Sequence, residues 1–190
     1  MNGKFSFGVS EEVLLNEKLK VGLEIDAAKL EYLKSIIEKD KTMEKVLNFL
    51  AYRPRSVFEI KQYLQRKNIE PVYIDEIITK LKRLGYLNDT SFARWYIEQR
   101  RSGSKRWGKK KIFMSLKNLG IENEVIEQEL KASNFEISEV ENARSEARKY
   151  VKKIHEKDLY KAKKKLSDAL SRRGYSWEIV KGIIAEFDFD

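Results

Sequence analysis

Two clusters of lysine residues lie where the sequence pattern predicts helices to start, one in a first turn and the other in the early part of a helix. The first cluster covers residues 109–111, and the second comprises Lys161, Lys163, Lys164 and Lys165. A cation near a helix N-terminus opposes the helix macrodipole, at about 0.3–1 kcal/mol for an exposed charge, so lysine is unusual at these positions. The amide groups of a first helical turn bind phosphate and carboxylate groups, and lysine side chains would strengthen that attraction. The two clusters therefore predict sites for an anion.

An aromatic residue, Trp107, lies just before the first lysine cluster. Its ring could stack on a nucleic-acid base. The alternative is that Trp107 lies at the edge of the core and that the lysines form a solvated surface, and the sequence leaves both open. The candidate residues for a nucleic-acid interface are Arg100, Arg101, Lys105, Arg106, Trp107, Lys109, Lys110, Lys111, Lys117, Lys161, Lys163, Lys164, Lys165, Arg172 and Arg173.

The charges alternate in blocks along the chain. Residues 99–121 carry eight basic residues and no acid, residues 122–141 carry seven acids and one lysine, and residues 144–173 carry twelve bases against four acids. The chain as a whole has a formal charge of +9. The partner that fits such a surface is a polyanion, or a protein with a charge pattern of its own.

Several classes of chemistry are disfavoured by composition. The chain has no cysteine, so it has no disulfide and no thiol nucleophile. The single histidine, His155, lies among charged residues and reads as a solvated helix residue. We find no glycine-rich phosphate loop and no spacing typical of metal ligands, and therefore expect neither a cofactor nor an enzyme. We find no signal-peptide or membrane-spanning pattern, and expect a cytoplasmic protein without a membrane contact.

An internal repeat organises the elements that must position these residues. When Leu64, Leu116 and Leu170 are aligned, apolar residues recur in all three copies at offsets −4, +5, +10 and +14. The spacing of apolar residues between these positions is helical. With only nine glycines and two prolines in 190 residues, we predict an all-α protein with short connections.

Residues that start and end helices support this division. Gly120, Gly174 and Asn68 follow the middle helices where a left-handed cap is expected, and Pro71, Glu122 and Ser176 lie where the third helices begin. Ser56 and Glu59 form a capping-box pattern for the middle helix of the first copy. We predict three tandem three-helix repeats, at 42–87, 89–133 and 138–187, which form an elongated, curved array.

Residues 1–41 do not follow the repeat and predict a short N-terminal arm. Phe5, Phe7 and Val9 alternate as in a short strand, and Ser10 could cap a helix that runs through Leu19. Asp26 is the expected cap of a further helix, which carries the apolar residues Leu30, Leu33 and Ile37.

The first copy also permits a second interpretation. Its three helices with a tight turn could form a helix-turn-helix unit that reads DNA as a transcription regulator. The last of these helices has mainly isoleucine and leucine and few side chains suited to reading bases, and the repetition favours a scaffold. A plain nucleic-acid-binding protein is the other alternative.

Four segments of the chain resemble the RecX family of bacterial regulatory proteins. Residues 53–60 (RPRSVFEI) resemble the start of the first full repeat of that family, and residues 84–93 (LGYLNDTSFA) resemble its signature of a leucine, two acids and a Phe-Ala pair. Residues 108–121 and 171–175 also fit, and the likeness runs from about residue 22 to 187. Asn88 departs from the pattern, which has an aspartate there, and we expect Asp89 to cap the next helix instead.

The resemblance implies a regulator of the RecA recombinase. Members of that family bind the recombinase–DNA filament, limit its growth and depress its ATP hydrolysis and strand exchange, in the setting of recombination, DNA repair and the SOS response. The expected partners are the RecA filament and DNA, chiefly single-stranded DNA and secondarily double-stranded DNA. We expect the protein to be a monomer. The second and third copies would supply the basic contacts to DNA or to acidic filament loops, and the first copy and the arm would contact protein.

Overall fold

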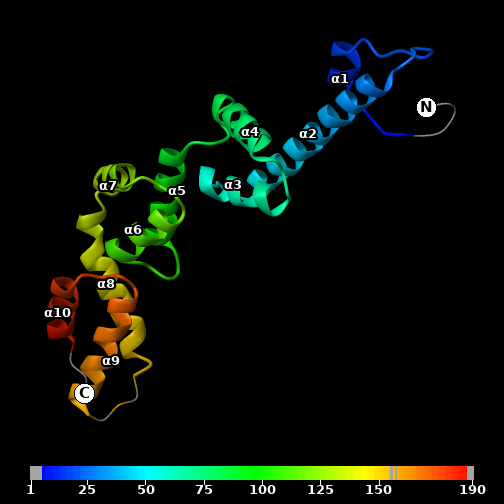
Figure 1. Ribbon diagram of the computed structural model, residues 1–190. Helices are drawn as coiled ribbons and strands as arrows, with labels where there is room; N and C mark the ends of the chain where they lie inside the picture. Colours follow the sequence, from blue (N-terminus) through cyan, green and yellow to red (C-terminus); the bar gives the residue numbers. More distant parts are fainter. Residues whose placement is uncertain (1–5, 155, 157, 188–190) are drawn as a thin grey trace.

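The structure is a computed structural model that describes residues 6–154, 156 and 158–187 (Figure 1). These residues form helices joined by loops, with no strand among them, which confirms the all-α prediction. The ten helices of the described residues are α1 (Glu11–Asn16), α2 (Ala27–Ala51), α3 (Val57–Arg66), α4 (Pro71–Arg83), α5 (Asp89–Ser102), α6 (Lys109–Asn118), α7 (Asn123–Ala132), α8 (Phe135–Val151), α9 (Leu159–Arg172) and α10 (Trp177–Glu186).

Nine of these helices form three bundles in chain order. Unit 1 contains α2, α3 and α4, unit 2 contains α5, α6 and α7, and unit 3 contains α8, α9 and α10, each around its own apolar cluster. The aligned leucines of the repeat, Leu64, Leu116 and Leu170, are each completely buried at the centre of one cluster. The three tandem three-helix repeats predicted from the apolar spacing are thus confirmed.

Local signals fix the ends of the repeat helices. Ser56 and Glu59 form the predicted capping box at the start of α3, and the Ser176 hydroxyl accepts a hydrogen bond from the Ile179 N–H at the start of α10. Gly120 and Gly174 have φ of 78° and 87°, in the left-handed region that glycine adopts without a steric penalty. The chain therefore turns directly after α6 and α9.

The N-terminal region differs from its prediction. Phe7 and Val9 lie in irregular backbone, and Phe5 lies outside the described residues. The Ser10 hydroxyl caps α1 as expected, but this helix ends at Asn16 and does not reach Leu19, because Lys18 turns into the left-handed region with φ of 51°.

Helix α2 is a single helix of 25 residues that begins at the predicted cap, Asp26. It runs across residue 41, where we expected the arm to end and the first repeat to begin. Residues 38–44 are mostly good helix formers, with no glycine or proline to stop the helix. The arm helix and the first helix of unit 1 are therefore one element.

The cap of α5 also differs from its prediction. The Asn88 side chain, not Asp89, accepts the hydrogen bond from the Ser91 N–H at the start of α5. Asp89 is thereby available to the preceding unit, and its Oδ1 accepts a hydrogen bond from the Val57 N–H at 2.9 Å. Asp89 caps α3 rather than its own helix.

The junction between units 2 and 3 brings the C-terminal end of α9 against the N-terminal end of α6. The Gly108 N–H donates to the Arg173 carbonyl at 2.9 Å, and the Lys110 N–H donates to the Gly174 carbonyl at 3.2 Å. A β-carbon on either Gly108 or Gly174 would overlap the backbone of the facing segment. Two glycines therefore permit the close approach, and hydrogen bonding continues from one helix end to the next.

Units 1 and 2 meet in a similar way. The ring of Phe58, in the first turn of α3, lies against Gly120, where a β-carbon would come within 2.6 Å of the Phe58 Cβ. At both junctions a carboxylate of the following unit caps the first amide of a middle helix: Asp89 accepts from Val57, and Glu139 accepts from Lys109. Burial raises the pKa of the Asp89 and Glu139 carboxyl groups.

These junctions produce the elongated, curved array that the sequence predicted (Figure 1). Helix α1 and the start of α2 lie at one end of the molecule, and unit 3 lies at the other end. The first and third units thus lie far apart, on either side of unit 2.

Candidate nucleic-acid interface

The backbone amides at the start of α6 are already occupied by protein acceptors. The Lys109 N–H donates to Glu139 Oε1 at 2.7 Å, and the amides on either side of it donate to carbonyls at the end of α9. These amides do not offer the anion site that the sequence predicted. The C-terminal end of α9 lies against the N-terminal end of α6. The lysines at the start of α6 therefore also lie at the negative end of the α9 dipole, which stabilises cations.

Two lysines of the first cluster take part in this junction. Lys111 Nζ donates to the Arg172 carbonyl at 3.2 Å, in the last turn of α9. Lys109 Nζ forms a 2.6 Å ion pair with Glu136 of α8, and this hydrogen bond lowers the pKa of the Glu136 carboxyl group. The contacts of Lys109 and Lys111 therefore support a structural role for these two side chains.

Trp107 lies half-buried against the core of unit 2. The Arg100 guanidinium lies 4.4 Å from the centre of its ring, and Lys111 Nζ lies 4.5 Å from it. The ring is thus held between core residues and two cations. This environment favours the alternative in which Trp107 is a residue at the edge of the core.

Arginine residues of the candidate set also make internal contacts. Arg173 pairs with the buried Glu146 at 3.1 Å, and its guanidinium donates to the Tyr150 hydroxyl. Arg101 donates to the Ser133 carbonyl at 2.6 Å and pairs with Glu98. The bonds of Arg173 join the end of α9 to α8, and the bond from Arg101 to Ser133 joins α5 to the end of α7, so the two side chains contribute to packing within units 3 and 2.

The second lysine cluster lies at the start of α9. The Asp158 side chain caps this helix by accepting a hydrogen bond from the Lys161 N–H at 3.1 Å. Lys161 Nζ lies 3.8 Å from Asp158, and Lys165 Nζ pairs with Glu156 at 2.9 Å. Two carboxylates that directly precede α9, those of Glu156 and Asp158, therefore already pair with lysines of this cluster.

A smaller set of candidate cations has no ion-pair partner among the described residues. In α6, Lys110 and Lys117 lie seven residues apart on one exposed face, with the half-exposed Met114 between them. Such side chains are point charges that can bind phosphate groups without reading base sequence. The exposed members of the set are Lys105, Lys110, Lys117, Lys164 and Arg172, and its half-buried members include Arg100, Arg106 and Lys163.

The structure does not favour a helix-turn-helix reader in unit 1. The apolar face of α4, which includes Ile74, Ile78 and Leu81, is buried in the core. Its exposed face carries Asp75 and Glu76, which pair with Lys61 and Lys39. The exposed basic residues Lys80, Lys82 and Arg83 lie in the last turn of α4, whereas the N-terminal part, with which a recognition helix contacts bases, is acidic.

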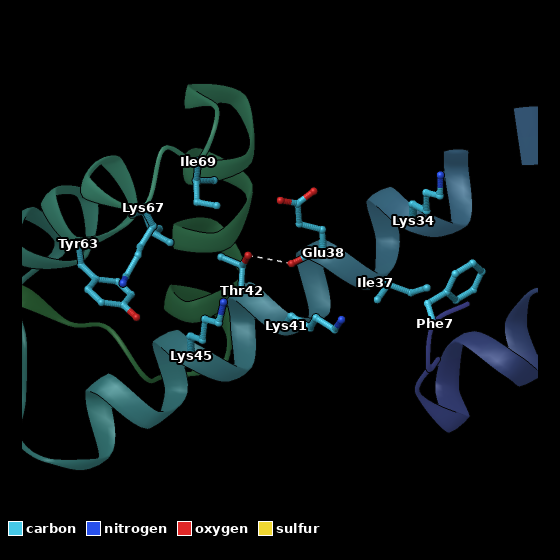
Figure 2. Close-up of a pocket in the computed structure, with 11 residues that line it drawn as sticks. Phe7, Lys34, Ile37, Glu38, Lys41, Thr42, Lys45, Tyr63, Lys67 and Ile69 are labelled. Atoms are coloured by element: carbon cyan, nitrogen blue, oxygen red, sulfur yellow. Dashed lines mark hydrogen bonds between the residues drawn. The ribbon is translucent and has the colours of Figure 1, made fainter. Parts of the chain in front are cut away.

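A further group of lysines, outside the candidate set, lines a cavity along α2 (Figure 2). Lys34, Lys41 and Lys45 come from α2, and Lys67 follows α3. The spacing of seven and four residues places the first three on one helix face. The sequence could have shown this group if residues 27–51 had been taken as one continuous helix. The boundary that we predicted at residue 41 assigns Lys34 and Lys41 to the arm and Lys45 to the first repeat.

The described residues provide neither a metal site nor a membrane-spanning helix. No group of three His, Asp or Glu side chains there could hold a metal ion. No helix among them is sufficiently long and apolar to cross a membrane.

Family models match each unit of the chain. The model of the first RecX three-helix domain matches residues 43–86, that of the second domain matches residues 88–130, and that of the third domain matches residues 137–184. The three matches follow the order of units 1, 2 and 3.

Curated relatives and solved structures show the same likeness. "Regulatory protein RecX" of Listeria welshimeri is 33% identical over 96% of this chain, which spans 67% of that protein. The Bacillus subtilis protein of the same name is 29% identical over the whole chain and 71% of its own length. A crystal structure of regulatory protein RecX has a TM-score of 0.76 at 22% identity, covering 96% of this chain and 91% of that one. The crystal structure of RecX from Lactobacillus salivarius has a TM-score of 0.67 at 28% identity, and the match covers 80% of this chain and 97% of that one.

Proposed function

The chain belongs to the RecX family of regulatory proteins, and we propose that it binds the RecA–DNA filament and restrains its growth, ATP hydrolysis and strand exchange. The observation that carries this proposal is the ordered match of three RecX domains to units 1, 2 and 3. In this function the protein is a regulator in the bacterial cytoplasm rather than an enzyme, and it acts as a monomer.

The shape and charge of the molecule support the proposal. An elongated array can contact more than one subunit of a helical filament, and linked weak contacts gain from effective concentration (Figure 1). Exposed cations of α6 and α9 without partners among the described residues would contact DNA phosphates or acidic loops of the filament. Unit 1 and the arm would contact the recombinase itself.

The test is the DNA-dependent ATPase activity of the recombinase with increasing amounts of this protein. Wild-type protein is expected to depress the activity at near-stoichiometric levels. The variant Lys110→Glu with Lys117→Glu should require about tenfold more protein, because the charge that faces two phosphates is reversed in sign. Salt titration of binding to single-stranded DNA should show a slope that is shallower by about 0.7 for each phosphate that the variant no longer neutralises.

The matched control reverses two exposed lysines outside the candidate set, Lys131→Glu with Lys181→Glu, and should inhibit like the wild type. Wild-type protein that leaves the ATPase unchanged would contradict the proposed function. Preference for one duplex sequence by roughly a thousandfold would instead identify a transcription regulator. DNA binding without any effect on the recombinase would identify a plain nucleic-acid-binding protein.

A further inference from the structure

The cavity along α2 is a groove with a basic rim and an apolar floor. Its volume is about 440 Å³, within the usual range for ligand sites. Figure 2 shows Phe7 at one end and Tyr63 at the other, with the lysines of α2 between them. Phe7, Tyr63 and Ile69 are half-buried and supply the accessible apolar part of the lining, and Ile37 and Leu64 lie buried beneath it. The groove can therefore accept both negative charge and an apolar side chain.

The charge of the lining is strongly unbalanced. Four lysines face one carboxylate, that of Glu38, among the eleven lining residues. Lys41 and Lys45 are exposed and have no ion-pair partner among the described residues, whereas Lys34 pairs with Glu31. The groove thus carries cations that the described part of the chain does not neutralise.

The geometry of α2 indicates the form of the ligand. From Lys34 to Lys45 the helix rises about 16 Å, since each residue adds about 1.5 Å. An extended peptide covers that length with about five residues, and its side chains alternate between two faces. Acidic side chains could meet the lysines while the apolar side chains between them meet the floor.

Of the two aromatic residues in the lining, Tyr63 already has stacking partners, which argues against a nucleic-acid base as the occupant. One face of Tyr63 is stacked on Phe49, with ring centres 4.5 Å apart, and Lys67 Nζ lies 5.9 Å from its centre. A base that stacked on Tyr63 would have to displace one of these neighbours. The favoured ligand is therefore a peptide with carboxylates.

We propose that this groove binds an extended acidic segment, with alternating apolar side chains, of a partner protein. The identity of the partner as a filament protein rests on the proposed function, but the groove itself does not. Unit 1 then has a binding site of its own, separate from the cations of α6 and α9 and formed by α2, by α3 and the turn after it, and by the arm.

The test measures binding of a fluorescein-labelled peptide of alternating Asp and Leu residues to the full chain by fluorescence anisotropy. The variant Lys41→Glu with Lys45→Glu should weaken binding at least tenfold, and high salt should weaken the wild-type complex because the contacts are charged. A peptide with Asn in place of Asp should bind at least tenfold more weakly. The control Lys131→Glu with Lys181→Glu has the same net charge as the variant Lys41→Glu with Lys45→Glu, and it should bind the peptide within twofold of the wild type.

Several outcomes would overturn this inference. One is equal binding of the peptide to wild type and to Lys41→Glu with Lys45→Glu. Another is loss of affinity for single-stranded DNA, rather than for the peptide, in that variant, which would make the groove a nucleic-acid contact. A third is dimerisation of the wild type that the variant abolishes, which would make a second copy the occupant. The peptide assay contains no recombinase, so its result does not depend on the ATPase test. A failure of the proposed function can therefore be distinguished from a failure of the groove proposal.

Discussion

At the scale of single residues, two glycines determine how units 2 and 3 meet. Gly108 begins α6 without a side-chain cap, and Gly174 ends α9 in the left-handed region. Their backbones approach so closely that a β-carbon on either would overlap the other segment. Glycine is needed at Gly174 for two independent reasons, which are its conformation and its contact.

The variant Gly174→Ala should therefore destabilise the protein by about 2–4 kcal/mol, from the left-handed conformation and from the overlap with Lys111. Urea unfolding followed by circular dichroism measures the loss. Gly182→Ala is the matched control, because Gly182 lies in α10 with open space around it. That change should stabilise the protein by about 0.5–1 kcal/mol. Equal effects of the two changes would contradict this account of the junction.

Asp89 gives a prediction for the dependence of stability on pH. Burial raises the pKa of its carboxyl group above the ordinary value of 3.8. Between the two values the folded state holds more protons than the unfolded state, so Asp89 lowers stability as the pH rises through that range. In Asp89→Asn the amide oxygen can still accept from the Val57 N–H, but it does not titrate.

The stability of Asp89→Asn relative to wild type should thus increase as the pH rises from below 3.8 through the raised pKa of Asp89. Urea unfolding of both proteins over a pH series measures this difference, and groups common to both cancel. A difference that is constant with pH, or that decreases, would show that the carboxyl group is not penalised by burial at this junction.

At the scale of helices, the sequence predicted what depends on neighbours along the chain. The capping box at Ser56, the cap at Ser176 and the left-handed turns at Gly120 and Gly174 are all local signals. The continuity of α2 was not predicted, because the apolar spacing changes near residue 41 while the helix-forming residues continue. A change in periodicity is therefore not a helix end unless a capping signal accompanies it.

The candidate site was harder to predict, because it depends on residues far apart in the sequence. Lys111 meets the end of α9 across 61 residues, and Lys109 meets Glu136 across 27. From the sequence alone, a lysine that is free at the start of one helix cannot be distinguished from a lysine that caps the C-terminal end of another helix packed against it. Only the junction distinguishes the lysines whose side chains contact the neighbouring unit from those, such as Lys110 and Lys117, that have no ion-pair partner among the described residues.

At the scale of the whole molecule, the two junctions differ in strength. Phe135 of α8 is buried in the core of unit 2, and Tyr175 of unit 3 donates to the Arg106 carbonyl at 3.2 Å. Among the described residues, the bond from Val57 to Asp89 is the hydrogen bond that joins units 1 and 2. In the described part of the chain, units 2 and 3 therefore share a buried side chain and several hydrogen bonds, whereas units 1 and 2 share the contact of Phe58 with Gly120 and one hydrogen bond.

Native-state hydrogen exchange should accordingly show two cooperative parts, because an array in which each repeat contacts only its neighbours loses structure where coupling is weakest. Amides of α5–α10 should exchange with a common opening free energy, and amides of α2–α4 with a separate one. In Gly174→Ala the opening free energy of α5–α10 should fall while that of α2–α4 stays the same, since the change lies at the junction of units 2 and 3. An equal fall in all three units would show that the array opens as one body and would contradict a weak coupling between units 1 and 2.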